Sequence, residues 1–320
     1  MEKDKQPFNG VLLVHKEKGM TSHDVVDQLR KILKQRSIGH AGTLDPMAEG
    51  LLVILLGQAT KLSVYILNQD KSYSLKMQFG LETDTFDKEG KVLKQEAVSL
   101  KKEEIEKTLK ASCGSLELKV PHFSAVKVRG RKLYSYARAG EEVEAPKKTM
   151  TFYDLKIHDI QPDQAQVSLS CAKGGYVRSW VNFVGEQLGV GACLIQMTRT
   201  ASHPFHSSQS LRVSEIDSRL KEKFPKDEIE LKTLLQDSFI YPSSALPDVF
   251  PVELTQRDAK ALSHGQIPPY VIQSALSRQI EVNKTGQPQL IQAVQDWRLS
   301  ALLEIRPFKK MKIIRNFTFS

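Results

Sequence analysis

Hydrophobic and polar positions along the chain follow two different periods, which predicts a protein built from both strands and helices. Residues 73–79 alternate strictly between apolar and polar side chains, as a strand with one buried face does. The same alternation recurs at residues 153–157 and 165–171. The apolar residues between positions 25 and 33 instead fall on one face at helical spacing. This mixed order of strands and helices favours an α+β fold over a regular βαβ series.

Local signals add further elements to this outline. A short buried strand is predicted at residues 10–14, and short helices are predicted at residues 99–109 and 176–188. Thr21 and Asp24 match the T-x-x-D capping box, in which two side chains satisfy free backbone amides at a helix start. The helix after Thr21 should therefore begin at that position.

The composition changes near residues 242–251, where Pro and Ser accumulate as they do in linkers. We therefore expect two domains, covering residues 1–241 and 242–320. Valine, isoleucine and leucine are spaced in the second as in a small β-rich domain. A second capping box, Thr255 with Asp258, predicts a short helix in it.

Charge and cysteine content narrow the class of protein. The 320 residues carry a formal net charge of +9, which favours a polyanionic partner such as nucleic acid, although a merely basic protein is the alternative. The three cysteines are too few and too scattered for a disulfide framework or a zinc site. The N-terminus is polar, and the longest apolar run, residues 51–56, is too short to cross a bilayer. We therefore expect a cytoplasmic protein without a membrane segment.

Residues 39–50, GHAGTLDPMAEG, form the most informative stretch. Pro46 pushes Asp45 toward extended backbone, and Gly42 permits close backbone approach, so the loop can present one carboxylate rigidly to a pocket. The alternative is an ordinary Asp-Pro turn, in which Asp45 satisfies nearby backbone groups. The pattern alone leaves both interpretations open.

This stretch resembles the signature of the bacterial TruB tRNA pseudouridine synthases, GH-x-G-x-LDP-x-A-x-G, which carries the catalytic aspartate. Five further blocks resemble the family in the same order, so that the similarity covers most of residues 9–205. They read GVLLVHKEKGMTSHDVV, GQATKL, KSYSLKMQFGLETDTFDKEG, HFSAVKVRGRKLYSYARAG and CAKGGYVRSWVNFVGEQLGVGACL. The resemblance implies a pseudouridine synthase fold with a mixed, largely antiparallel sheet and a small PUA-like C-terminal domain.

The resemblance also implies a reaction, the isomerisation of uridine to pseudouridine in the T-loop of tRNA, at position 55 in tRNA numbering. The C1′–N1 bond breaks and the uracil rejoins C1′ through C5, so no redox cofactor and no metal should be needed. Asp45 would act either as a nucleophile on the sugar or as a base at a sugar hydrogen. No second carboxylate is evident beside it in the sequence.

Three residues are expected to act with Asp45. Tyr73 matches the family tyrosine that stacks on the target base, and its hydroxyl could assist a late proton removal; the alternative is an aromatic residue at a strand start. Arg178 matches the arginine that pairs with the aspartate, although a surface arginine at a helix start is possible. Met197 stands where the family usually has a leucine against the base, and alone it would be a core residue.

Four more positions match family residues around the pocket or the RNA. His40 would fill the space left by a flipped base, or would be a buried, hydrogen-bonded histidine. Lys16 matches a further family position around the pocket or the RNA. Lys61 would contact phosphate or support the loop, unless it is a solvated lysine. Asp87 would bond the flipped nucleotide or cap a turn.

An insertion at about residues 121–150 resembles the family segment that folds over the RNA. Alternation there predicts Lys127 and Arg129 on one strand face, with Arg131 close by, as a ridge that tracks the RNA backbone. A solvated charged hairpin is the alternative.

The sequence departs from the family at His15–Glu17, at Ser179–Trp180 and at Met197–Thr198, which affects peripheral RNA contacts rather than the reaction. We expect a monomer that acts on the T-arm of tRNA without a guide RNA. Two rival hypotheses are a pseudouridine synthase for another RNA and a non-catalytic tRNA-binding or tRNA-folding protein.

Overall fold

The structure is a computed structural model that describes residues 8–124, 126–141 and 143–317. The polar N-terminal residues 1–7 and Ala125 of the predicted insertion lie outside the described residues, as do residues 142 and 318–320.

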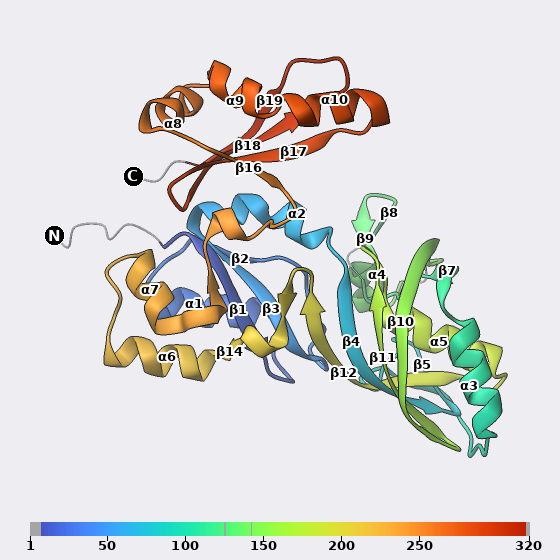
Figure 1. Ribbon diagram of the computed structural model, residues 1–320. Helices are drawn as coiled ribbons and strands as arrows, with labels where there is room; N and C mark the ends of the chain where they lie inside the picture. The colour runs from blue at the N-terminus through green and yellow to red at the C-terminus, as the bar shows by residue number, and fades with distance from the viewer. Residues whose placement is uncertain (1–7, 125, 142, 318–320) are drawn as a thin grey trace.

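In the described part of the chain, eleven strands form one mixed sheet, with the main order β14-β1-β3-β12-β4-β11-β10-β7 (Figure 1). β2, β13 and β15 pair at its sides with β3, β12 and β1. The described pairs β1–β14 and β3–β12 are parallel and the others are antiparallel, which confirms the predicted mixed, largely antiparallel sheet. The strands are β1 (Gly10–Lys16), β2 (Ile38–His40), β3 (Glu49–Leu56), β4 (Lys71–Phe79), β7 (Gly114–Lys119), β10 (Lys147–Gln161), β11 (Gln164–Cys171), β12 (Ala192–Ser202), β13 (Phe205–His206), β14 (Leu211–Arg212) and β15 (Phe239–Ile240).

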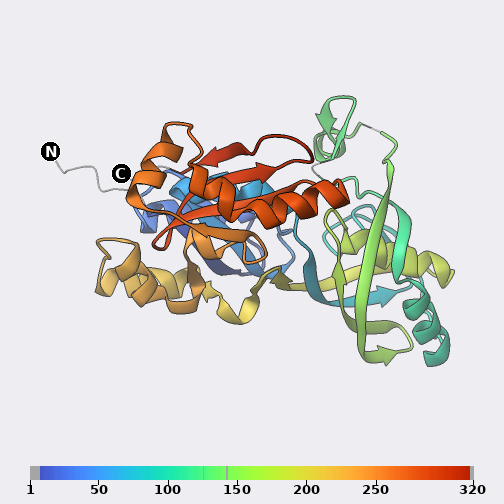
Figure 2. The ribbon, with the colours of Figure 1, turned by 45° about the horizontal axis from the view of Figure 1, so that its top comes forward.

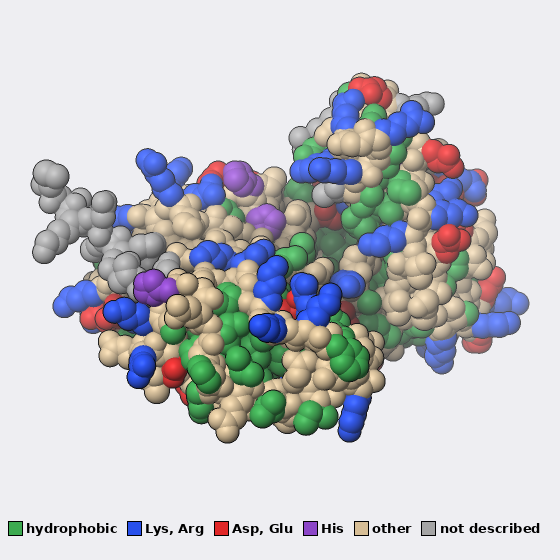
Figure 3. All heavy atoms as spheres, turned by 90° about the horizontal axis from the view of Figure 1, so that it is seen from above, with side chains coloured by type: hydrophobic (Ala, Val, Ile, Leu, Met, Phe, Trp, Pro, Cys, Tyr) green, Lys and Arg blue, Asp and Glu red, His purple; other side chains and the backbone are tan. Residues whose placement is uncertain are grey.

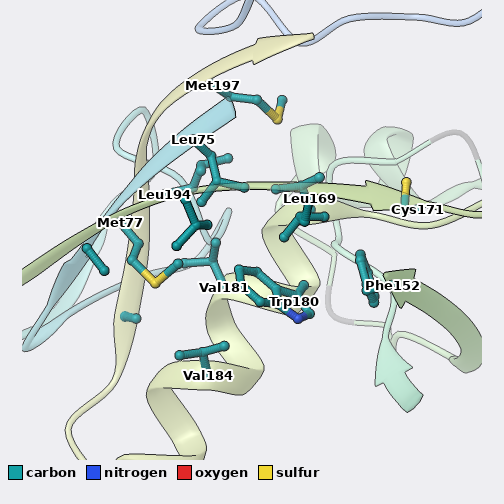
Figure 4. Packing of buried hydrophobic residues seen from close by; sticks show 14 of the residues in the cluster. Leu75, Met77, Phe152, Leu169, Cys171, Trp180, Val181, Val184, Leu194 and Met197 are labelled. Atoms are coloured by element: carbon teal, nitrogen blue, oxygen red, sulfur yellow. The ribbon is translucent and has the colours of Figure 1, made fainter. Parts of the chain in front are cut away.

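Helices cover both halves of this sheet (Figure 1). Side chains of α1, α6 and α7 pack in one cluster with those of β1 and β3. Side chains of α3 and α5 pack in another with those of β4, β10, β11 and β12, where Trp180 lies at the centre (Figure 4). The helices and 3₁₀ turns of this part are α1 (Ser22–Ile32), η1 (Gly57–Leu62), α2 (Ser63–Leu67), α3 (Lys102–Ala111), α4 (Leu133–Ala139), α5 (Val177–Gln187), η2 (Ser207–Gln209), α6 (Val213–Glu222), α7 (Glu228–Leu235), η3 (Gln236–Ser238) and η4 (Pro242–Ser244).

The apolar run at residues 51–56 is strand β3, which is buried on both faces. Leu52 and Ile54 point into the cluster beneath α1, whereas Val53 and Leu55 point into a second cluster shared with the C-terminal domain. A strand covered on both faces needs apolar side chains at every position, which explains why the run does not alternate. Residues 41–48 form the Asp45 loop, which joins β2 to β3. Both ends of the loop are therefore held by strands of the sheet.

The C-terminal domain has a four-stranded sheet in the order β16-β17-β18-β19, with three helices packed on it (Figure 2). Val294, Leu299 and Phe317 of this part pack in one cluster with side chains of β1 and β3 from the eleven-stranded sheet. The division of the chain at residues 241 and 242 stays a prediction. The elements are β16 (Phe250–Glu253), α8 (Gln256–Ser263), α9 (Pro269–Ser274), α10 (Leu276–Thr285), β17 (Gln289–Gln295), β18 (Arg298–Ile305) and β19 (Lys312–Asn316).

Both predicted capping boxes are confirmed. Asp24 N donates to Thr21 Oγ1 at 3.1 Å while Thr21 N donates to Asp24 Oδ2 at 2.8 Å. Thr255 and Asp258 exchange the same pair of bonds. The predicted helix at residues 99–109 is displaced toward the C-terminus, because Lys101 is its N-cap and the helix starts at Lys102.

The predicted strand face shared by Lys127 and Arg129 is wrong. The strands of this hairpin are only β8 (Lys127–Val128) and β9 (Arg131–Lys132), and Arg129 lies in the turn between them. Arg129 has a φ of 50° and Gly130 a φ of 81°, which is the backbone of a tight two-residue hairpin turn. The alternation of charges therefore ends at the turn. A further short hairpin is formed by β5 (Leu81–Thr83) and β6 (Val92–Gln95).

Candidate active site

The Asp45 loop is held by hydrogen bonds from the start of α1. Gly19 N donates to Pro46 O at 2.8 Å. Ser22, the first residue of α1, accepts from Leu44 N at 2.9 Å and donates to Leu44 O at 3.2 Å. The residues on both sides of Asp45 are thus attached to a capped helix, so the backbone that carries the carboxylate has a fixed position.

Asp45 forms an ion pair with Arg178. The Arg178 Nε atom lies 3.0 Å from Asp45 Oδ2, and the side chain of Asp45 keeps 32% of its surface exposed while that of Arg178 keeps 5%. Arg178 is the second residue of α5, where the helix dipole disfavours a cation. Its position is therefore sustained by the acceptors around it. The predicted contact between the two residues is present, and the catalytic roles stay predictions.

Arg178 binds three other groups with the rest of its guanidinium. Nη1 donates to Thr85 O at 3.0 Å and Nη2 donates to Phe123 O at 3.0 Å. Nη1 also lies 3.5 Å from Asp87 Oδ2. One side chain thus joins the Asp45 loop, the segment after β5 and the beginning of the insertion.

Asp87, which the sequence analysis placed around the pocket or the RNA, is a second carboxylate beside Arg178. Its Oδ1 accepts from Thr85 Oγ1 at 2.7 Å and from Glu89 N at 3.1 Å. Burial raises the pKa of Asp87, and the Thr85 hydroxyl and the Arg178 guanidinium oppose that rise. The carboxylate is only 7% exposed, so it is placed to orient Arg178.

Tyr73 and Met197 lie on the neighbouring strands β4 and β12. Tyr73 is partly buried against the cluster that contains Trp180, and burial raises the pKa of its phenol to about 12. The phenol is therefore protonated at neutral pH. Met197 is 5% exposed and packs in the same cluster beside Leu75 (Figure 4). The structure thus brings Met197 into the core, and a contact with a base stays a prediction.

Lys16 lies beneath the Asp45 loop with no exposed surface. Its Nζ donates to Met20 O at 2.8 Å, to Glu17 O at 3.0 Å and to Pro46 O at 3.4 Å. Burial lowers the pKa of its ammonium group to about 8. Lys16 therefore supports the backbone next to Asp45 from inside the protein.

His40 precedes the Asp45 loop at the end of β2, and Lys61 belongs to η1, which follows β3. His40 ends β2, is partly buried, and its Nδ1 has no hydrogen-bond partner in the described part of the chain. Burial and the charge of Arg199 lower the pKa of His40, which favours the neutral imidazole. Lys61 Nζ donates to Asn316 O at 2.7 Å and lies 5.6 Å from the Phe317 ring centroid, so the structure places it against the C-terminal segment.

Arg131, in the insertion hairpin, is already engaged within the protein. Its Nη1 lies 2.8 Å from Glu141 Oε1, and its Nη2 donates to Ser135 O. The guanidinium also lies 4.5 Å from the Tyr136 ring centroid. Lys127 and Arg129 are exposed.

A cavity of about 890 Å³ is lined mainly by residues of the insertion, together with Asp84 and Lys119. Phe123, whose carbonyl accepts from Arg178, is part of its wall. Seen from above, Lys and Arg side chains gather on both sides of a hollow between the C-terminal domain and the insertion (Figure 3). This arrangement suits a large anionic ligand.

Arg199 is a component of the site that the sequence analysis did not single out. It stands on β12, two residues after Met197, and is 1% exposed. Its guanidinium contacts the Asp45 loop. The sequence signal for Arg199 was its place in Met197–Thr200, where the resembled family usually has L-R-R-T.

Among the described residues, no three His, Cys, Asp or Glu side chains come together in a group that could hold a metal ion. No helix in the described ranges has the length and apolar character to span a membrane.

The chain is similar to known proteins along its whole length. Residues 30–177 match the family model described as TruB family pseudouridylate synthase, N-terminal domain. A protein of Bdellovibrio bacteriovorus named tRNA pseudouridine synthase B is 38% identical over 320 residues, which cover 99% of each chain. The chain belongs to the TruB family. Another TruB protein of the same name, from Bacillus licheniformis, is 40% identical over 66% of this chain and 70% of its own.

The fold of this TruB family member also matches a solved structure. A chain of an H/ACA RNP bound to a substrate RNA containing 2′-deoxyuridine superimposes with a TM-score of 0.68 over 99% of this chain and 92% of that one. The sequence identity is 18%, so this likeness concerns the fold alone.

The buried state of Lys16 predicts a pH-dependent stability. Between pH 8 and pH 10.5 the unfolded chain keeps the proton on this lysine while the folded chain releases it. The free energy of unfolding of the wild type, relative to Lys16→Met, should therefore rise with pH in this window by at most about 1.4 kcal/mol per pH unit. Urea unfolding from pH 7 to 10.5 measures the difference.

The matched control for this prediction is Lys31→Met, which removes an exposed lysine from α1. A difference between wild type and Lys16→Met that stays flat across the window would contradict the buried, readily deprotonated lysine.

Proposed function

We propose that this chain converts uridine to pseudouridine in the T-loop of tRNA, at position 55 in tRNA numbering. Membership of the TruB family supports the reaction, and the names of the relatives support tRNA as the substrate. The observation that carries the proposal is the Asp45–Arg178 pair, a partly exposed carboxylate held by a buried guanidinium. The choice of uridine follows from the motifs around this pair.

In this proposal Asp45 attacks C1′ of the target nucleotide or removes a sugar hydrogen, and either step releases uracil from the sugar. The uracil turns and rejoins C1′ through C5. A proton then leaves C5 and N1 ends protonated, so no atom is gained or lost overall. Arg178 orients the carboxylate, because a charge-assisted hydrogen bond fixes its position.

Tyr73 and His40 are proposed to handle the base. A base stacked in the T-loop must leave the stack before it can reach Asp45, at a cost of a few kcal/mol. Tyr73 would stack on the flipped uracil, and with a pKa near 12 its phenol would act at neutral pH as a hydrogen-bond donor before any role as a base. The neutral imidazole of His40 would stack in the space that the base leaves.

The remaining surfaces are proposed to hold the T-arm. Residues 1–241 would form the catalytic domain, with Lys127 and Arg129 of the insertion hairpin against the RNA backbone. Residues 242–320 would form the PUA-like domain. Lys61 would act by fixing that domain to the catalytic sheet, given its bond to Asn316 O. The protein would work as a monomer in the cytoplasm, and a bare T-arm hairpin without guide RNA would suffice as substrate.

Replacing the proposed catalytic carboxylate should separate binding from chemistry. Asp45→Asn should bind a T-arm RNA hairpin with a Kd within about threefold of the wild type, because the two side chains have nearly the same shape. Pseudouridine formation, measured by nucleotide-resolution mapping of the hairpin, should be abolished. Asp217→Asn, which replaces a partly exposed carboxylate of α6 that also pairs with a cation, serves as the matched control. Product formed by Asp45→Asn would rule out Asp45 as the catalyst.

Salt dependence should reveal whether the insertion hairpin touches phosphates. Each lost phosphate contact lowers the slope of log K against log salt by about 0.7 to 0.9. The double variant Arg129→Ala, Arg131→Ala should therefore flatten the slope by roughly one to two. Arg129→Ala alone should produce part of this change. Arg131 can bind a phosphate only after its ion pair with Glu141 breaks.

Lys221→Ala is the control for the hairpin variants, because α6 lies on the opposite side of the molecule (Figure 1). A double variant that keeps the wild-type slope would show that the hairpin does not track the RNA backbone.

A further inference from the structure

Arg199 is a buried cation whose partners are backbone carbonyls. Its Nε donates to Leu51 O at 2.7 Å, its Nη1 to Thr43 O at 3.3 Å and its Nη2 to Gly42 O at 3.2 Å. A buried arginine ordinarily pairs with a carboxylate. In the described part of the chain, Arg199 has these backbone carbonyls as partners instead. A buried charge of this kind is a poor source of stability, since apolar residues of similar volume often serve a core as well or better.

The three carbonyls belong to the two ends of the Asp45 loop. Gly42 and Thr43 precede Asp45 by three and two residues, and Leu51 belongs to β3, which begins after the loop. The planar guanidinium therefore ties the entry of the loop to the strand at its exit. A lysine cannot reproduce this, because its ammonium is one point rather than a rigid fork.

Backbone pairing brings Arg199 to this place. β12 runs parallel to β3, with Arg199 opposite Gly50, and antiparallel to β4, with Arg199 opposite Tyr73. Gly50 has a φ of +103°, and a Cβ there would lie 2.5 Å from Arg199 O, so only glycine permits this close approach.

The same arginine also reaches the aromatic side of the site. It pairs with Tyr73 across β12 and β4, and its positive charge opposes the rise in the pKa of Tyr73 that burial causes. Arg199 is thus bonded to the loop that carries Asp45 and lies opposite the residue proposed to stack on uracil. A shift of about 1 Å between reacting groups can cost about 100-fold in rate, so such a link matters.

We propose that Arg199 is a positioning residue that sets the distance between Asp45 and Tyr73. It acts through the carbonyls of Gly42 and Thr43 and through its place opposite Tyr73 in the pairing of β12 with β4, and it does not touch the substrate. The inference depends on the proposed function, because it assumes that Asp45 performs the chemistry on a base stacked against Tyr73.

Single-turnover kinetics on a saturating T-arm hairpin test this role with Arg199→Lys and Arg199→Met. Both variants should lose about 100-fold in the rate of pseudouridine formation, with a Kd for the hairpin within about threefold of the wild type. Arg219→Met is the matched control, since Arg219 also donates to a backbone carbonyl, Leu234 O, but lies in α6. It should react at the wild-type rate.

A purely structural role would give a different result. Circular dichroism measures the folded fraction of each variant at the assay temperature, and a rate loss explained by that fraction would overturn the proposal. If Arg199→Met does not fold, Arg199→Lys decides, and a folded Arg199→Lys with a rate within threefold of the wild type would also overturn it. Millimolar guanidinium should restore part of the rate of a folded Arg199→Ala but not that of Asp45→Asn, and absence of this rescue would count against the proposal.

The activities of the wild type and of Asp45→Asn distinguish a failure of the Arg199 inference from a failure of the proposed function. Wild-type protein that forms pseudouridine while Asp45→Asn does not upholds the function, whatever the Arg199 variants do. If Asp45→Asn forms pseudouridine, the assignment of the chemistry to Asp45 is wrong.

Discussion

The guanidinium of Arg178 is the interaction on which the arrangement of the site depends. It is 5% exposed and contacts four groups from three segments, namely Asp45, Asp87 and the carbonyls of Thr85 and Phe123. A buried arginine at a helix start is unfavourable unless such acceptors surround it. The fold therefore gathers the acceptors around Arg178, and Asp45 stays partly exposed with one carboxylate oxygen held by the guanidinium.

The Asp45 loop shows how a fold can hold an irregular segment rigid without regular secondary structure. Lys16 and Arg199 lie behind it, both almost without exposed surface, and donate to its carbonyls. Backbone carbonyls inside a loop need donors, and buried cations form stronger hydrogen bonds to them than neutral groups do. The loop is thus held by buried positive charge, which suits a site for an anionic substrate.

The sequence predicted those features that depend on local patterns. The alternation at residues 73–79 gave β4, and the Thr21 and Thr255 capping boxes gave the starts of two helices, because each is decided within a few residues. The Asp45–Arg178 pairing came from family resemblance. Arg199 was missed because its partners depend on the pairing of β12 with β3, which joins residues about 150 apart in the chain. The Arg129 turn was missed because alternating charges hid a backbone of positive φ.

Arg178→Lys tests most directly whether the guanidinium fork controls the carboxylate. The measurement is the single-turnover rate of pseudouridine formation on a saturating T-arm hairpin, alongside the Kd for the same RNA. A lysine keeps the charge but cannot reach Asp45, Asp87 and two carbonyls together. The account predicts a rate loss of about 100-fold or more with the Kd nearly unchanged. A rate close to that of the wild type would contradict it.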